Sequence, residues 1–392
     1  MDKQSKNFIY TATGAAFGLG GILRFPALCL SYGGAFVAAY IAVIVFAGAP
    51  LLAAEFALGA RSKSLFPLKQ ICPYGGAVGG LSAINSVAMC ACYGAVIAVL
   101  AMRSCTFYSQ VNYGLTADMP QITPFIAALV FIALAFFVCR NARTRARVAR
   151  VAVIFQAALF AVLAARGLMY SNCAKVLAEA FALNASLLIS PQVWLAAVGQ
   201  ALLSLSLAAG VMPAFAAEMP RSLSPVRAAA IVCGANLGGG LLAAVATITL
   251  AGGAGCLDGL GGSALQNALS LYPAALSAAF SNAHICGLFG SIFYISLTLT
   301  AFVSTLSLVR PAYLWVCRAR ISARTAAFML CAALFAVCLP FCLGAPVGAA
   351  DKICCEVVAP IAAAGEISCF AFHLLTARRR CAKIDVWKIL NS

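Results

Sequence analysis

Arg24 and the glycines that precede it are the residues most able to do chemistry in this chain. They lie in Gly14–Pro26, a stretch in which Arg24 is the single charged residue among glycines and apolar side chains. In hydrocarbon every backbone amide needs an internal partner, so a helix-breaking run is tolerated only where protein covers it or where it lines a cavity. Broken transmembrane helices expose backbone groups that bind solutes and ions. The stretch therefore predicts a binding site inside a membrane span.

A second interruption, Ser204–Pro213, lies inside the apolar segment 191–217 and also contains Gly210. Ser204 and Ser206 taken singly would more often bond the carbonyl of the preceding helical turn than a ligand. Their interest comes from lying opposite the first break. Glycine and proline interruptions in corresponding spans of two halves indicate an inverted repeat with the binding site between the halves.

The elements that position these breaks are membrane spans. The chain has 392 residues, of which 64% are hydrophobic and 9% are charged, with a mean hydropathy of +1.01. Soluble domains have about 45–50% apolar and about 25% charged residues. With about 20 residues per span, the hydropathy predicts spans at 9–32, 35–59, 77–105, 121–140, 148–169, 191–216, 226–252, 283–317, 322–345 and 353–376.

These spans divide into two halves of five, and an odd number per half makes the second half run in the opposite sense. We expect residues 1–170 to form the first repeat, 171–190 an extracellular connection and 191–392 the second repeat. The loop 252–282 has no lysine or arginine, which predicts an extracellular helical hairpin that acts as a lid. Residues 377–392 are expected to be a short cytoplasmic tail.

The basic residues predict the orientation and exclude one class of partner. The formal net charge is +16, but most lysines and arginines alternate by loop in the positive-inside pattern. This pattern predicts a multi-pass protein of the cytoplasmic membrane with both termini in the cytoplasm. The basic run 140–150 is read as a topology signal beside anionic lipid, so no nucleic-acid partner is expected.

Enzymatic and metal chemistry have little support. The 18 cysteines lie mostly within apolar spans and show no paired metal-ligand spacing, so we interpret them as small packing residues. His284 and His373 are isolated. No span carries paired carboxylates, a Ser/Lys dyad or an HExxH run, so we expect neither catalysis nor an organic cofactor.

Two long motifs resemble one known family. The run GLGGILRFP at 18–26, with Tyr32–Phe36 and Gly48–Leu51 after it, resembles the first two helices of the neurotransmitter:sodium symporters, which have the LeuT fold. Trp194–Gln200, which leads into Ser204–Leu207, resembles the sixth helix of that family. The resemblance implies an all-α membrane protein, a LeuT-type 5+5 inverted repeat with broken helices 1 and 6. It also implies ten helices, without the eleventh and twelfth helices of many members.

The resemblance implies an amino-acid substrate. Amides at helix N-termini suit a carboxylate and carbonyls at C-termini suit an ammonium group, and Tyr93 is the hydroxyl donor to the carboxylate. Gly18 stands where carriers of monoamines have an aspartate. Ala209 stands where many members have an aromatic residue, which favours a large apolar or aromatic substrate side chain. The implied lining is Ala15, Ala16, Leu19, Gly20, Met89, Tyr93, Leu203, Ser204, Ser206, Ala209, Ser304 and Leu308.

Two sodium sites are implied, and each lacks a ligand. The implied ligands of sodium site 1 are Ala16, Ser204 and Asn236, with Gly21 in place of an expected asparagine. Those of sodium site 2 are Gly14, Phe17, Thr300 and Ser304.

In site 2, Val303 replaces a hydroxyl ligand unless a shift of register brings Thr305 into use. The need for chloride stays open, because Gly240 carries neither the serine nor the acidic residue found in the family. The remaining positions that match the anion environment are Tyr40, Gln200, Ser204 and Asn236.

The resemblance also implies gates and a brace. Arg24 and Asp351 would close the outer gate, and Glu55 would brace the broken sixth helix, with Gln200 as a further structural residue. The family's basic residue and tryptophan are absent from residues 1–10, and their partner aspartate appears as Arg318. Inner gating therefore needs other contacts.

We expect a secondary active transporter that carries an amino acid into the cell by alternating access with sodium coupling. Two alternatives stay open. One is a uniporter or leak on the same fold with altered or lost sodium coupling, and the other is a non-transporting sensor. A homo-oligomer is possible on this sequence.

Overall fold

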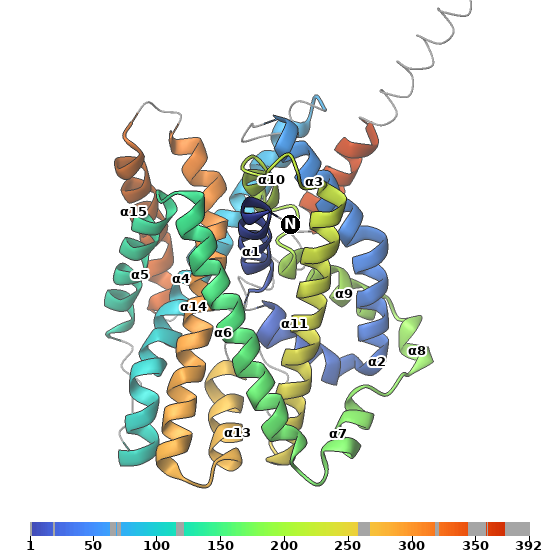
Figure 1. Cartoon of the computed structure of the whole chain (residues 1–392), viewed down its shortest axis with the longest axis vertical. Helices are drawn as coiled ribbons and strands as arrows, with labels where there is room; N and C mark the ends of the chain where they lie inside the picture. Colours follow the sequence, from blue (N-terminus) through green and yellow to red (C-terminus); the bar gives the residue numbers. More distant parts are fainter. Residues whose placement is uncertain are drawn as a thin grey trace, which may run out of the picture.

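The computed structural model describes residues 2–18, 20–62, 68, 72–114, 121–257, 267–317, 321–343, 358 and 360–372, and within these ranges it contains helices and no strands. Long helices run side by side in one bundle, and the short helices α1 and α10 lie near its middle (Figure 1). The helix α4 packs along α14, α6 packs on α11, and α1 packs on α6. The all-α expectation is confirmed.

The first span breaks where its glycines predict. Helix α1 (Lys3–Ala16) begins at Asp2, whose carboxylate accepts from the Ser5 amide at 2.8 Å. It ends at Phe17, whose φ and ψ of −86° and 58° leave the helical region. The chain resumes as the π-helix η1 (Gly20–Arg24), which leads into α2 (Phe25–Val43).

Gly33 separates the first span from the second inside α2. Its φ of +62° and ψ of −151° interrupt the helix, and this region is open essentially to glycine alone. A Cβ at this position would lie 2.7 Å from the carbonyl oxygen of Ala182. The second span then continues through η2 (Ile44–Gly48) and α3 (Ala49–Ser62).

The remaining spans of the first half are unbroken. They are α4 (Gly75–Tyr113), α5 (Thr123–Val138) and α6 (Ala142–Leu168), and the short helices α7 (Cys173–Ala180) and α8 (Ala185–Leu188) form the connection to the second half.

The sixth span breaks between α9 (Pro191–Ser204) and α10 (Val211–Ala216). Within the break Ser206, Ala208 and Gly210 have positive φ angles of 51°, 56° and 69°. Left-handed conformations are uncommon for residues other than glycine and cluster at functional sites. Two non-glycine residues in this region show that surrounding contacts hold the break in place.

The second half continues in the order that the spans predict. Its further elements are α11 (Pro225–Gly253), η5 (Asn267–Leu271), α13 (Tyr272–Ala279), α14 (Ala283–Val316), α15 (Ala323–Cys342) and the helix Pro360–Phe372.

Six helices in the described part of the chain are long and apolar enough to cross a membrane, or seven if α7, α8 and α9 count as one bent span. Ten spans were expected. The breaks shorten spans one and six, and Gly20–Arg61 forms one stretch of 42 residues that holds parts of two spans. Thr123–Val138 and Pro360–Phe372 are apolar but short.

The hairpin expected over residues 252–282 is described only in part, because residues 258–266 lie outside the described residues. The described part contains helix α13. Helix α13 and the η5 turn before it make hydrogen bonds to the bundle. The Tyr272 hydroxyl lies 2.6 Å from the Thr247 hydroxyl, and the Tyr294 hydroxyl donates to the carbonyl of Ala268 at 2.7 Å. The Arg166 guanidinium donates to the carbonyl of Ala279 at 2.6 Å. These bonds tie the segment to α6, α11 and α14.

Candidate functional site

The two breaks face each other and are joined by side-chain bonds to backbone carbonyls. The Ser206 hydroxyl donates to the carbonyl of Ala15 at 3.2 Å, and the Gln200 side chain donates to the carbonyl of Gly20 at 3.0 Å. Each bond connects the sixth span with one side of the first break. The carbonyls that unwinding frees thus find partners on the opposite span.

Glu55 holds the sixth-span break from the other side. Its carboxylate, 1% exposed, accepts from the amide of Ala208 at 2.9 Å. The Ser86 hydroxyl donates to the carbonyl of Ala209. Both groups satisfy backbone atoms that an unbroken helix would pair internally, which explains why Ala208 can keep its left-handed conformation.

A small cavity lies between the breaks. It is bordered by nine of the residues that the sequence proposes as substrate lining, namely Gly20, Met89, Tyr93, Leu203, Ser204, Ser206, Ala209, Ser304 and Leu308. Ala15 and Ala16 do not border it, although Ala15 contributes its carbonyl to the contact with Ser206. Leu19 is outside the described residues.

The cavity is small in this structure. Its volume is about 30 Å³, which is about the space of one water molecule. A Cβ on Gly20 would lie 2.5 Å from a methyl group of Leu203, so Leu203 packs directly on the first break. A ligand larger than water therefore needs these two segments to move apart.

Asn85 also borders the cavity, and the sequence reasoning missed it. Its side chain is 5% exposed, and its Oδ1 has no hydrogen-bond partner among the described residues. The sequence spacing of Asn85 relative to Met89 and Tyr93 could have identified it. Residues 85, 89 and 93 are four apart and therefore share one face of a helix, and two of them were already in the predicted lining.

Tyr40, Ser204 and Asn236 form a closed triangle beside the first break. The Asn236 amide donates to the Tyr40 hydroxyl at 2.8 Å and to the Ser204 hydroxyl at 3.0 Å, and the two hydroxyls are 3.0 Å apart. The Oδ1 of Asn236 has no partner among the described residues, and it lies 3.8 Å from where a side chain on Gly21 would begin. A buried acceptor without a donor is a fitting ligand for a cation.

The residues proposed for the second sodium site lie on α1, the first break and α14. The position of a Gly14 Cβ is 3.1 Å from the Cγ1 of Val303, and that of a Gly18 Cβ is 2.7 Å from the hydroxyl of Ser304. The Thr305 hydroxyl donates to the carbonyl of Ala301 at 2.9 Å. Val303 rather than Thr305 therefore faces Gly14. One hydroxyl ligand is replaced by an apolar side chain.

Thr300 and Ser296 of α14 bond the side chain of Gln156. Their hydroxyls donate to its Oε1 at 3.0 Å and 2.8 Å. This contact joins α14 to α6 beside the proposed second sodium site.

Arg24 is the last residue of η1 and is partly buried. Its proposed gate partner, Asp351, lies outside the described residues, as does Arg318.

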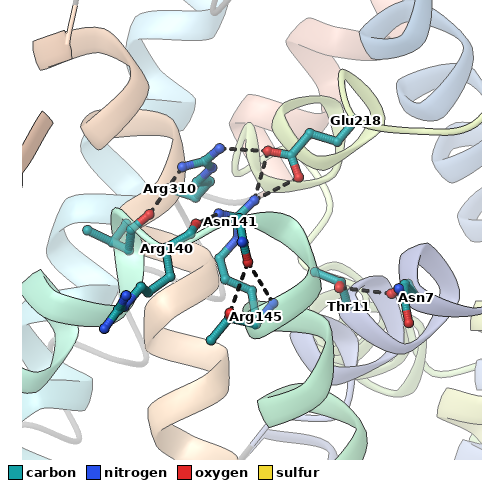
Figure 2. Close-up of polar contacts among 9 residues, drawn as sticks. Asn7, Thr11, Arg140, Asn141, Arg145, Glu218 and Arg310 are labelled. Atoms are coloured by element: carbon teal, nitrogen blue, oxygen red, sulfur yellow. Dashed lines mark hydrogen bonds and ion pairs between the residues drawn. The ribbon is translucent and has the colours of Figure 1, made fainter. Parts of the chain in front are cut away.

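A network at the opposite end of the bundle was not predicted. Glu218, just beyond α10, bonds Arg145 of α6 and Arg310 of α14, each at 2.7 Å (Figure 2). Arg310 also donates to the carbonyl of Val138 at 3.2 Å. The two arginines are 5% and 8% exposed. The carboxylate therefore ties the end of the sixth span to the fifth and eighth spans.

The N-terminus makes a further contact on this side. The Ser222 hydroxyl donates to the Asp2 carboxylate at 3.1 Å, and Arg150 donates to the side chain of Asn7 at 2.9 Å. Hydrogen bonds from Ser5 hold the pKa of Asp2 below its ordinary value, with Ser222 adding to the effect.

A bundle of apolar helices in which two broken spans meet around a small central cavity is the architecture of a membrane transporter. A model described as the sodium:neurotransmitter symporter family matches residues 2–120 and 119–343. The chain belongs to the sodium:neurotransmitter symporter family.

Two relatives and one solved structure illustrate the similarity. The human protein named inactive sodium-dependent neutral amino acid transporter B(0)AT3 is 30% identical over 258 residues, 55% of this chain and 41% of that protein. The mouse protein named sodium-dependent neutral amino acid transporter B(0)AT3 is 28% identical over 287 residues, 62% of this chain and 46% of that protein. The chain thus spans under half the length of these relatives.

The crystal structure of MhsT in complex with L-phenylalanine matches with a TM-score of 0.80 and 22% identity. The match covers 91% of this chain and 86% of that chain. It confirms the LeuT-type fold with broken helices 1 and 6.

Proposed function

We propose that this protein carries an amino acid into the cell by alternating access, with sodium as the coupling ion. The observation that carries the proposal is the pair of breaks joined through Ser206 and Gln200 around a small cavity. Backbone groups at broken helix ends are suited to both charges of a zwitterion. A relative is named as a sodium-dependent neutral amino acid transporter, and this name supports the same class of substrate and coupling ion.

In the proposed bound state the substrate carboxylate meets the Tyr93 hydroxyl, and the side chain lies toward Met89 and Leu308. Asn85 adds an acceptor at this end of the cavity. Ala209 leaves room where a larger residue would narrow the site, which favours a large apolar or aromatic substrate. The bound phenylalanine in MhsT belongs to that protein and agrees with this preference.

Sodium fits the first site better than the second. The carbonyl of Ala16 and the side chains of Ser204 and Asn236 would hold it, and the unpartnered Oδ1 of Asn236 supports this assignment. At the second site Gly14, Phe17, Thr300 and Ser304 would act without the hydroxyl that Val303 replaces. An ion bound at the first site would add positive charge next to the substrate carboxylate.

The proposed orientation follows the positive-inside pattern. In this orientation both termini lie in the cytoplasm. Helix α13 lies on the extracellular face of the protein, which spans the cytoplasmic membrane. The Glu218 network then lies on the cytoplasmic side and Arg24 on the outer side, where we propose that it pairs with Asp351. The division into repeats at 1–170 and 191–392 belongs to the same proposal.

Uptake into liposomes tests the function. The purified chain is reconstituted, and radiolabelled amino acids are offered as a panel with an inward sodium gradient or with choline in its place. We expect accumulation above the external concentration for phenylalanine, tryptophan or leucine, with sodium required. Tyr93→Phe removes the proposed carboxylate donor and should raise KM, whereas Tyr113→Phe on the exposed end of α4 is the matched control. Accumulation that is unchanged in choline refutes sodium coupling.

An uncoupled uniporter or a non-transporting sensor is the second candidate. The replacements at Gly21 and Val303 favour it, because each removes an ion ligand. The human relative's printed name, which includes the word inactive, concerns that protein alone. Uptake that never exceeds the external concentration identifies a uniporter. Saturable binding without flux identifies a sensor.

A further inference from the structure

A second, larger cavity lies on the other side of the sixth-span break. Its volume is about 550 Å³, and its walls come from α3, α4, α10, α14, α15 and the helix Pro360–Phe372. Ala209 borders both this cavity and the small one between the breaks. The two spaces therefore share one wall, made by the residue next to the amide that Glu55 holds.

The walls of the larger cavity are almost entirely apolar except at one end. There the carboxyl groups of Glu55 and Glu366 contact each other, and Glu366 also contacts the Ser82 hydroxyl. The two side chains are 1% and 2% exposed. One oxygen of each, Oε2, has no hydrogen-bond partner among the described residues. Both residues border the cavity.

Buried acceptors of this kind need a donor. An unpaired buried polar group destabilises a fold, and the cost is larger when the group is charged. A protonated amine supplies both positive charge and several N–H donors to the two free oxygens. A bare ion would leave most of the volume empty, since cavities of about 300–1,000 Å³ suit organic ligands.

The entrance matches a ligand that reaches the protein through lipid. Ile84, Trp315 and Val337 lie on the cavity wall and are 66%, 60% and 50% exposed. They belong to three membrane-spanning helices, α4, α14 and α15, so the exposed faces of these apolar side chains meet acyl chains rather than water. A molecule that already partitions into the bilayer has direct access.

We propose that this cavity binds a lipophilic amine, with its protonated nitrogen at Glu55 and Glu366 and its apolar body between α4, α14 and α15. Charge complementarity at one end and apolar walls elsewhere select this class over neutral lipids and over polar amines. Because Glu55 also holds the amide of Ala208, an occupant fixes the break in one arrangement. If the proposed transport function is correct, such amines inhibit uptake without competing with the substrate.

Direct binding tests the site independently of transport. The probe is 3,3-diphenylpropylamine, and its neutral counterpart is 3,3-diphenylpropan-1-ol. Both are titrated calorimetrically into the full chain in lipid nanodiscs, with empty nanodiscs subtracted. We expect saturable binding of the amine and about tenfold or greater weakening for the alcohol, since hydrogen bonds to charged groups contribute about 1.5–3 kcal/mol.

Three variants locate the binding site. Glu366→Gln keeps the shape of the side chain and should weaken amine binding about tenfold. Glu179→Gln changes an exposed carboxylate of α7 and should leave it unchanged. Tyr93→Phe, in the small cavity, should also leave it unchanged. If Glu366→Gln does not fold, Ala83→Trp fills the larger cavity while both carboxylates remain, and it should abolish binding.

Several outcomes overturn the proposal. Equal affinity for the amine and the alcohol removes the role of the carboxyl pair. Unchanged binding in Glu366→Gln or in Ala83→Trp places the probe elsewhere, and loss in Tyr93→Phe places it in the substrate cavity. Absence of binding to the wild-type protein shows that lipid or another part of the chain fills the space. Binding without any transport supports the site and refutes only the proposed function.

Discussion

Gly21 lies opposite the unpartnered Oδ1 of Asn236, and a Cβ on Gly21 would be 3.8 Å from this oxygen. That distance is an ordinary van der Waals contact, so a side chain can be added here without a clash. At the proposed first sodium site, an oxygen-bearing side chain at position 21 can therefore reach the space beside Asn236.

The first prediction restores this ligand. Gly21→Asn adds a carbonyl oxygen next to Asn236 and should lower the sodium concentration that gives half-maximal uptake by about tenfold, the effect of about 1.4 kcal/mol. Gly21→Ala, which adds the Cβ without an oxygen, is the control and should not lower it. Sodium titrations of amino-acid uptake in liposomes provide the measurement. An equal response of both variants would show that the side chain acts by packing.

The second prediction concerns the Glu218 network. Glu218→Gln leaves two nearly buried guanidinium groups with less charge compensation. The free energy of unfolding should fall by about 2–3 kcal/mol, less than the 3–5 kcal/mol of a fully buried pair, because the Glu218 side chain is 36% exposed. The unfolding midpoint in detergent is the readout.

Lys175 and Glu179 provide the matched control for this network. They form a pair at 4.0 Å with side chains 81% and 66% exposed. Exposed pairs contribute about 0–1 kcal/mol, so Glu179→Gln should leave the midpoint nearly unchanged. Equal shifts in the two variants contradict a structural role for Glu218.

The third prediction concerns the kink at Gly33. Gly33→Ala forces a side chain into a positive-φ conformation and toward the Ala182 carbonyl at 2.7 Å, which should destabilise the protein by about 1–3 kcal/mol. Gly80→Ala is the control, because no atom lies within 4 Å of a Cβ at that helical position. Thermal unfolding of the two variants in the same detergent compares them. A harmless Gly33→Ala would mean that the kink does not depend on glycine.

The fourth prediction concerns pH and the N-terminus. Hydrogen bonds from Ser5 and Ser222 lower the pKa of Asp2, so the folded state favours the ionised carboxylate. The stabilisation is present at neutral pH and is lost as the pH falls through the lowered pKa. Asp2→Ala should speed amide exchange in the first turn of α1 at pH 7. The difference from wild type should shrink once Asp2 is protonated, and a difference that persists at low pH argues against the carboxylate.

The fifth prediction concerns Asn85. Asn85→Leu removes a buried acceptor without a partner and should raise the stability of the substrate-free protein by about 1 kcal/mol or more. It should weaken uptake of substrates with a side-chain hydrogen-bond donor relative to leucine. Competition assays with threonine and leucine measure the second effect. Identical losses for both substrates contradict a role in side-chain recognition.

The positions of both breaks were predictable because glycine, proline and charge are conspicuous in an apolar span. The sequence predicted where the sixth span breaks but not which residues adopt left-handed conformations. Ser206 and Ala208 have no local preference for positive φ. The contacts that support them, from Glu55 and Ser86, come from distant parts of the chain. The ends of the helices were not predictable in the same way, because hydropathy does not register where helical backbone stops.

The amino-acid sequence by itself determined the membrane class, the order of the helices, the two breaks and most of the residues at the cavity between them. These features depend on local composition and on spacing along one helix. The tertiary structure alone decided which polar atoms are satisfied, since that depends on groups from separate helices. It placed Asn236 opposite Gly21 and Glu55 beside Glu366, residues that lie far apart in the chain and meet only when the spans pack together.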